Sequence, residues 1–253
     1  MSHSPIEVLI VGGGAAGFFA AIACAEADPT ARITLFERSS RPLNKVRISG
    51  GGRCNVTHDS MDPALLVHHY PRGGRALRGP LSRFGPLETI AWFAAQGVEL
   101  KTESDGRMFP ITDDSETIVS TLVNAAERAS VRIRTRAPVT NVERSPGTSG
   151  SRSGGFSVTL AGEETVRADR VLLATGSNPR AYAWAESLGH AIVPPVPSLF
   201  TFEIDDPRLE GLAGISVPDA RVQLVGTKHE QRGPLLITHW GLSGPAVLKL
   251  SAW

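Results

Sequence analysis

Residues 8–37 hold the sequence feature that most constrains the fold of this chain. The apolar run 8–11 is followed by Gly-Gly-Gly-Ala-Ala-Gly at 12–17, then by an alanine-rich stretch and a second apolar run at 33–36, which ends at Glu37. This order predicts a buried strand, a tight glycine turn, a helix and a second strand. A strand–helix–strand unit of this kind pairs its strands in parallel, so we predict an α/β fold with a parallel sheet.

The same segment has the spacing of a dinucleotide-binding turn. Gly12 permits a sharp turn, Gly14 lets the backbone approach a pyrophosphate, and Gly17 lets the helix pack closely on the sheet. The unpaired N–H groups at the start of the helix would bind the phosphates. Glu37, twenty residues after the last glycine, is placed to accept hydrogen bonds from ribose hydroxyls. Glycines that serve only a tight turn are the alternative, but the flanking strand, helix and acid favour dinucleotide binding.

The bulk composition is that of an ordinary globular protein. The chain has 253 residues, 41% of them hydrophobic, and a formal net charge of +1. This balance argues against nucleic acid as the main partner, and no apolar run approaches the roughly 20 residues that span a bilayer. Cys24 and Cys54 match neither a disulfide framework nor a metal site, and residues 1–5 do not resemble the start of a signal peptide. We therefore expect a cytoplasmic protein.

A second glycine-rich segment follows the first. Residues 38–53 carry five cations and no acid, and they include Ser-Gly-Gly-Gly at 49–52. Backbone N–H groups and positive charge beside a phosphate-binding turn predict a loop that closes over the same ligand. A solvated basic loop is the alternative interpretation.

The pattern from residue 81 onward alternates between helical and strand-like segments. We predict helices over 81–96 with Gly97 as the cap, from Ser115 with Ile118, Leu122, Ala125 and Ala126 on its inner face, and from Pro179 to before Gly189. We predict strands at 98–101, 131–142, 156–160, around Val166 and at 171–173, a polar loop at 103–114 and a hairpin connection at 145–155. The strands in 156–167 would form a β-meander inserted as a crossover before the chain returns to the parallel sheet.

The character of the sequence changes after the proline-rich stretch 194–197. Strands are predicted at 201–204 and 221–225, and 243–245 is typical of a helix start. A unit of about 60 residues rarely buries enough surface to be stable alone. We therefore place a domain boundary near residue 194 and expect the chain to stop within the second domain.

Four segments together resemble a known family. They are 11–17, 48–57 (Ile-Ser-Gly-Gly-Gly-Arg-Cys-Asn-Val-Thr), 106–110 (Gly-Arg-Met-Phe-Pro) and 238–245 (Thr-His-Trp-Gly-Leu-Ser-Gly-Pro). In this order they look like the BaiN-type bacterial flavoproteins, also described as NAD(P)/FAD-dependent or aminoacetone-oxidase-family FAD-binding enzymes.

The resemblance implies non-covalent FAD in a Rossmann-like domain of the glutathione-reductase type, with an inserted β-rich substrate domain. Residues 1–193 would form the FAD-binding domain and residues 194–253 part of the substrate domain. The family ends in a further FAD segment with no match here, which implies a C-terminally truncated chain. The implied cofactor-binding residues are Gly12, Gly13, Gly14, Ala15, Ala16, Gly17, Glu37, Arg38, Lys45, Ser49, Gly50, Gly51, Gly52, Arg53, Cys54, Asn55, Val139, Ala174, Thr175 and Gly176.

The expected function is that of an FAD-dependent oxidoreductase acting on a small organic substrate. NAD(P)H is a possible reductant, although only one glycine fingerprint is present. His239, expected at a strand-to-helix turn, is the candidate catalytic residue, and a structural hydrogen-bonding role is its alternative. Because flavin carries the redox chemistry, no acid–base pair is required.

Other interpretations stay open or are disfavoured. A non-catalytic FAD-binding half-protein that needs a second polypeptide is the alternative function. Flavin-dependent RNA modification is disfavoured by the near-neutral charge and by the lack of a long basic stripe outside 38–53. We expect Cys54 to serve in packing, Cys24 to lie in the core and the pair His68-His69 to bind no metal.

Overall fold

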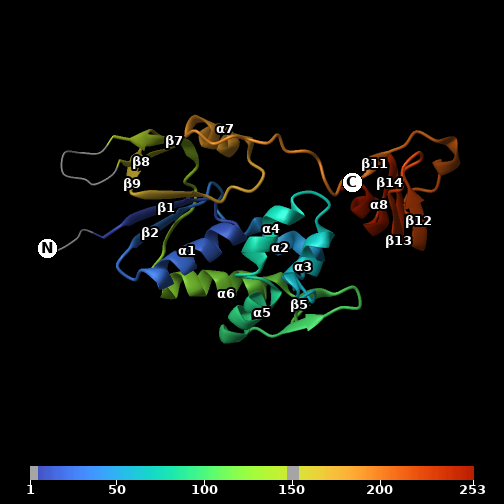
Figure 1. Cartoon of the computed structure of the whole chain (residues 1–253), viewed down its shortest axis with the longest axis horizontal. Coiled ribbons are helices and arrows are strands. Elements are labelled where there is room, and N and C mark those ends of the chain that lie inside the picture. The colour runs from blue at the N-terminus through green and yellow to red at the C-terminus, as the bar shows by residue number, and fades with distance from the viewer. Residues whose placement is uncertain (1–4, 147–153) are drawn as a thin grey trace. The chain divides into compact units, whose positions relative to one another are not determined.

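The computed structural model describes residues 5–146 and 154–253, which form two compact units (Figure 1). The first unit contains the residues up to Met61 and residues 84–192, and the second contains residues 62–83 and 193–253. Sequence reasoning assigned 62–83 to the first domain, whereas the structure groups this segment with the C-terminal part of the chain. Among the described residues, no helix is both long and apolar enough to cross a membrane.

The first unit is built on a parallel sheet. Its strands lie in the order β10 (Arg170–Leu173), β1 (Glu7–Val11), β2 (Arg32–Phe36) and β6 (Arg132–Arg134). Side chains alternate between the two faces of a strand, so Ile10 joins the core on one face, while Leu9 and Val11 join the core on the other. The predicted α/β class is confirmed.

Helices cover one face of this sheet. α1 (Ala15–Ala27) and α6 (Ser115–Arg128) bury their apolar stripes with Ile10, Ile33 and Leu35. The predicted helix start at Ser115 and its inner face are confirmed, since Asp114 caps the helix and the four predicted side chains are buried. The prediction that Cys24 lies in the core is wrong: it is exposed. In α1 the buried side chains recur with a helical period, and Cys24 falls on the outer face.

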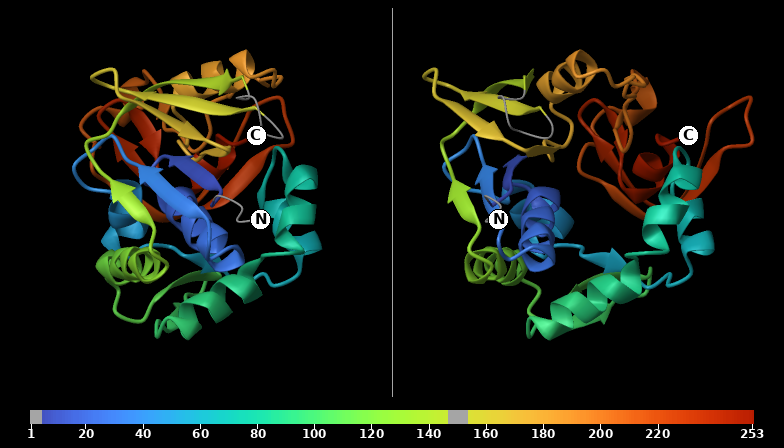
Figure 2. Two further views of the ribbon diagram at one scale, coloured as in Figure 1. Left: turned by 90° about the vertical axis from the view of Figure 1, so that its left-hand side faces the viewer. Right: turned by 60° about the vertical axis from the view of Figure 1, so that its left-hand side comes forward.

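A β-meander covers the opposite face, as both views in Figure 2 show. It consists of β7 (Val139–Ser145), β8 (Gly155–Leu160) and β9 (Thr165–Ala168), all antiparallel, and α7 (Pro179–Ser187) packs with it. The predicted meander and the helix from Pro179 are confirmed. The predicted strand 131–142 is instead divided between β6 and β7, because Arg136, with φ of 51°, breaks the extended backbone. Most of the predicted hairpin connection lies outside the described residues.

A small antiparallel sheet completes the first unit. It has the order β3 (Thr57–His58), β5 (Arg107–Pro110) and β4 (Leu100–Thr102). It lies near α5 (Pro86–Ala95) and near the 3-10 turn Ser49–Gly52, which follows α2 (Asn44–Ile48). The prediction of a polar loop at 103–114 is therefore wrong for β5, whose Met108 and Phe109 are buried. The predicted helix 81–96 begins later, at Pro86, which occupies its first turn.

The second unit contains a four-stranded antiparallel sheet. Its strands have the order β11 (Phe202–Glu203), β14 (Gly241–Ser243), β13 (Glu230–Thr238) and β12 (Ser216–Gln223), and α8 (Pro245–Leu250) follows them. The 3-10 turn Pro207–Leu209 lies between β11 and β12. Residues 62–83 add α3 (Pro63–Leu66), the 3-10 turn Val67–His69 and α4 (Gly74–Leu81). The predicted helix start at 243–245 is confirmed by α8.

Candidate functional site

The glycine turn after β1 is packed so tightly that it excludes side chains at two positions. Gly12 has φ of 117°, and a Cβ atom on it would lie 2.4 Å from the carbonyl oxygen of Ala174. A Cβ atom on Gly17 would lie 1.9 Å from the carbonyl oxygen of Gly12. Both contacts are with backbone, which cannot rotate away. The turn therefore requires glycine for the reasons that the fingerprint predicts.

Gly14 differs from these two glycines because the space beside it is open. It is the N-cap of α1, with no atom within 4 Å of the position of a Cβ atom and no side chain capping the helix. The first N–H groups of a helix have no acceptor within the helix, and Ala15 and Ala16 next to them are exposed. The start of α1 therefore offers N–H donors and a partial positive charge to an anion.

Glu37 connects the end of β2 to the glycine turn. Its Oε2 accepts a hydrogen bond of 2.9 Å from the N–H of Gly13, and its Oε1 accepts bonds of 2.8 and 2.7 Å from the N–H and hydroxyl of Ser39. A carboxylate has about four lone-pair sites, so these bonds leave capacity for a further donor. The carboxylate is fixed in place beside the turn, and its contact with a ribose stays a prediction.

A third segment meets the turn at the end of β10. The N–H of Ala174 donates to the carbonyl of Val11 at 2.8 Å. The Nζ of Lys45 lies 3.9 Å from the position of a Cβ atom on Gly176. The ammonium group is exposed, and it has no ion pair with any residue that the structure describes. The glycine turn, Glu37 and the 174–176 turn thus meet at the carboxyl ends of parallel strands, where α/β sheets bind ligands.

The second glycine-rich loop follows α2. The N–H of Leu43, the N-cap residue of α2, donates a hydrogen bond of 2.8 Å to the carbonyl of Gly13 and so connects α2 to the glycine turn. Its glycines 50, 51 and 52 have φ of 57°, 69° and 88°, a backbone conformation that favours glycine. A Cβ atom on Gly50 would lie 2.7 Å from the ring of Phe109. The loop therefore packs against β5, and two motifs far apart in sequence form one structure.

Arg53 is engaged by the protein itself. Its guanidinium forms an ion pair with Glu103, lies 3.6 Å from a carboxylate oxygen of Asp113 and stacks 4.1 Å from the centre of the Phe109 ring. Sequence reasoning missed these acids because they lie in what it took for a polar loop. Part of the predicted basic character of 38–53 is thus neutralised, and a contact between Arg53 and the cofactor stays a prediction.

The remaining predicted cofactor residues have different surroundings. Cys54 is buried with φ of 63°, and burial raises the pKa of its thiol, which favours packing over a redox role. Val139 is buried in the same apolar cluster as Phe36. Arg38 and Asn55 are exposed. Contact of any of these residues with a cofactor stays a prediction.

His239 does not lie at a strand-to-helix turn, so that placement is wrong. It is exposed in the turn between β13 and β14, because the short strand β14 precedes α8. A Cβ atom on Gly241 would lie 2.3 Å from the carbonyl oxygen of Phe202, so β14 pairs closely with β11. The catalytic role of His239 stays a prediction.

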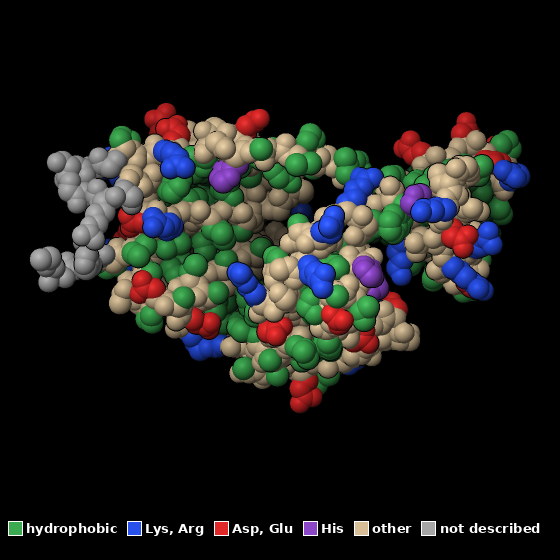
Figure 3. All heavy atoms as spheres, in the orientation of Figure 1, with side chains coloured by type: hydrophobic (Ala, Val, Ile, Leu, Met, Phe, Trp, Pro, Cys, Tyr) green, Lys and Arg blue, Asp and Glu red, His purple; other side chains and the backbone are tan. Residues whose placement is uncertain are grey.

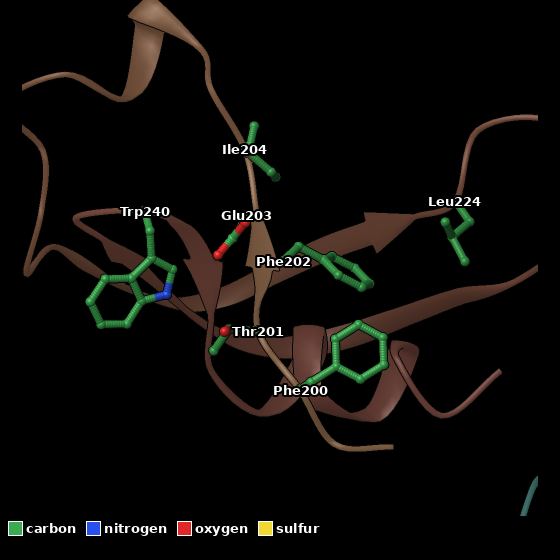
Figure 4. Close-up of a pocket in the computed structure, with 7 residues that line it drawn as sticks. All are labelled: Phe200, Thr201, Phe202, Glu203, Ile204, Leu224 and Trp240. Carbon is green, nitrogen blue, oxygen red and sulfur yellow. The ribbon is translucent and has the colours of Figure 1, made fainter. Parts of the chain in front are cut away.

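The second unit also contains an open hollow that sequence reasoning missed (Figure 4). Seven residues line it: Phe200, Thr201, Phe202, Glu203, Ile204, Leu224 and Trp240. Phe200 and Phe202 have ring centres 5.7 Å apart at 71°, and Trp240 is 55% exposed. These side chains come from three separate segments, which no sequence spacing links. Among the described residues, no group of three or more His, Cys, Asp or Glu side chains could hold a metal ion.

Known proteins resemble this chain over most of its length. The chain is 31% identical over 258 residues to the ribosomal RNA dihydrouridine synthase of Escherichia coli, covering 98% of this chain and 60% of that protein. It is also 31% identical over 252 residues to the 3-dehydro-bile acid delta(4,6)-reductase of Clostridium scindens, covering 96% of this chain and 59% of that protein. The chain therefore spans about 60% of the length of these relatives.

One solved structure supports the fold. The 3-ketosteroid-delta4-(5alpha)-dehydrogenase of Rhodococcus jostii RHA1 has a TM-score of 0.51 and 20% identity, with 70% of this chain and 47% of that chain covered. Residues 6–244 match the family described as the HI0933-like protein Rossmann domain. Together with the parallel sheet and its glycine turn, this match shows that the chain belongs to the HI0933-like Rossmann family.

Proposed function

We propose that the chain binds FAD non-covalently and serves as an FAD-dependent oxidoreductase of the BaiN type. One observation carries the proposal: at the carboxyl ends of the sheet, Gly12 and Gly17 are closed to side chains while Gly14 is open at the start of a helix. That combination suits a pyrophosphate that approaches the backbone directly. Glu37, held beside the turn, suits the ribose of the same ligand.

The residues present fit the charge of this cofactor. The N–H groups at the start of α1 would donate to the pyrophosphate oxygens. The ammonium of Lys45, which has no acidic partner among the described residues, would offset their negative charge. The backbone of the glycine loop 49–52 would line the approach to the ligand. When bound, FAD would supply the capacity to accept and donate a hydride. The protein would orient the cofactor and exclude competing reactions.

We propose further that the reaction reduces a carbon–carbon double bond conjugated to a carbonyl group. The names of the two relatives support this class, since a dihydrouridine synthase saturates a double bond of the uracil base and a delta(4,6)-reductase saturates one of a 3-dehydro-bile acid. Overall, NAD(P)H and a proton would be consumed, and one hydride and one proton would add across the double bond. The relatives' substrates differ greatly in size, so we propose both a nucleic acid-borne uracil and a small organic enone as substrate classes to test.

The test is spectroscopic. The purified chain, reconstituted with FAD, should show bound flavin absorbance that bleaches anaerobically with NADH or NADPH and recovers when an enone is added. Bound FAD that neither nicotinamide reduces would favour the non-catalytic alternative. A folded chain that takes up no FAD would overturn the proposal.

We also propose a cytoplasmic location. Cys24 and Cys54 are both free thiols in the structure, which suits a reducing compartment. Fluorescence microscopy of a tagged full-length protein would test this location, and a signal confined to the cell envelope would contradict it.

A further inference from the structure

The segment between Asp62 and Glu88 has an unusual charge pattern. It contains Arg72, Arg75, Arg78 and Arg83 together with two histidines, and it contains no acidic residue. The net charge of +1 for the whole chain hides this local excess, because acids elsewhere balance it. In the structure residues 63–83 of this segment form α3, α4 and the turns around them within the second unit, whereas residues 84–87 belong to the first unit.

The arginines of this segment are exposed, and three of them lack partners. Arg72 donates a hydrogen bond of 3.1 Å to the carbonyl of Trp253. The guanidinium groups of Arg75, Arg78 and Arg83, which we call the arginine strip, make no ion pair or hydrogen bond with any residue in the described ranges. Figure 3 shows Lys and Arg side chains around the place that α4 occupies in Figure 1. By contrast, eight arginines elsewhere have acidic partners: Arg32, Arg47, Arg53, Arg107, Arg134, Arg208, Arg221 and Arg232.

Repulsion between the positive charges of the strip destabilises α4, and a bound anion would reduce this repulsion. Arg75 and Arg78 are three residues apart on α4 and therefore share a face, about 4.5 Å apart along the helix axis. Like charges at this spacing destabilise a helix, and no acidic side chain of the segment compensates them. Guanidinium groups match the geometry of phosphate oxygens and are weakly hydrated, which suits them to contact a phosphate backbone.

We propose that the arginine strip is a contact surface for the phosphate backbone of an RNA strand. This inference rests on the proposed function and chooses the nucleic acid-borne uracil as its substrate class. It departs from the sequence-based expectation of no nucleic acid partner, which relied on net charge. The distribution of charge, rather than its sum, governs contact with a polyanion.

The second unit also carries the aromatic groups that single-stranded RNA requires. Proteins that bind single strands combine positive charge along the backbone with aromatic side chains on which bases stack. Trp240 and Phe200 are exposed at the hollow of the second unit. An anionic membrane is a less suitable partner, because the exposed positions of α4 include no large aliphatic or aromatic side chain: they are Arg75, Ala76, Arg78, Gly79 and Pro80.

The test measures RNA binding by the FAD-loaded chain as a function of salt. The probe is a fluorescein-labelled 20-nucleotide oligouridine, followed by anisotropy between 50 and 300 mM KCl. The variant R75Q/R78Q/R83Q removes the strip. The matched control, R167Q/R170Q/R180Q, removes three exposed arginines of the first unit. Both variants should keep the native circular dichroism spectrum and the native FAD content.

Each phosphate contact on a single strand contributes about 0.7 to the slope of log K against log salt. Loss of three contacts should therefore lower the slope by about 2 and weaken binding roughly 100-fold at 0.1 M KCl, whereas the control should change affinity less than about threefold. Equal binding by the strip variant and the native chain would overturn the inference. Absence of native binding at 50 mM KCl, or binding only to phosphatidylserine vesicles, would do so as well.

The experiments distinguish a failure of the proposed function from a failure of the inference about RNA. If the native chain takes up no FAD, the oxidoreductase proposal is lost whatever the RNA result. If FAD binds and NAD(P)H reduces it but the strip variant binds RNA normally, only the inference about RNA is lost.

Discussion

Replacing Gly14 with aspartate should separate cofactor binding from folding. No atom lies within 4 Å of the position of a Cβ atom on Gly14, and any residue can adopt the φ of −89° that Gly14 has. Aspartate is also a favoured N-cap, which differs from glycine by a few tenths of a kcal/mol in helix stability. The apo protein should therefore unfold at the same or a slightly higher urea concentration than the native chain.

FAD binding should respond in the opposite direction. The new carboxylate would stand where the pyrophosphate is proposed to lie, and two unit charges about 4 Å apart repel by about 4 kcal/mol at an effective dielectric constant of 20. That energy corresponds to a loss of roughly 1,000-fold in affinity. Titration of apo protein with FAD, followed by quenching of flavin fluorescence, measures the change.

The control is Ala23→Asp, which places the same charge on the exposed face of the same helix. It should bind FAD like the native chain, at a small cost in stability. Native FAD affinity in the Gly14→Asp variant would refute the placement of the pyrophosphate. A loss of apo stability above about 1 kcal/mol would show that the space beside Gly14 is needed for folding.

Three further predictions concern the fold. Gly17→Ala should lower the free energy of unfolding, measured by urea titration, by about 1 to 3 kcal/mol, because the alanine methyl group would overlap the carbonyl oxygen of Gly12. An unchanged free energy of unfolding would contradict this packing. An aromatic disulfide reagent at pH 8 should label exposed Cys24 quickly and buried Cys54, whose pKa is raised by burial, only on unfolding; equal rates would argue against this burial. Hydrogen bonds from the Arg208 guanidinium lower the pKa of Asp206 from 3.8 to about 2. The ionised Asp206 therefore stabilises the fold above pH 4, and this stabilisation is lost as the pH falls towards 2. Asp206→Asn should remove that part of the pH dependence of unfolding in acid, and an unchanged dependence would contradict this role of Asp206.

Much of the first unit could be predicted because its signals are local. The parallel pairing of β1 and β2, the glycine turn and the helix from Ser115 depend on side chains within about thirty consecutive residues. Turn chemistry and apolar periodicity act over such distances. The position of Cys24 was missed even there, because an alanine-rich helix has too weak an apolar contrast to show which face is buried.

The sequence by itself determined that a glycine turn joins a buried strand to a helix, with an acid at the spacing of a dinucleotide site. Only the tertiary structure decided which charges are neutralised. Glu103 reaches Arg53 across fifty positions, and Phe109 packs under the glycine loop. Arg75 and Arg78 have no acidic partner among the residues that the structure describes. The physical reason is that Coulomb and packing energies depend on distance in space, which sequence spacing does not report beyond one or two elements.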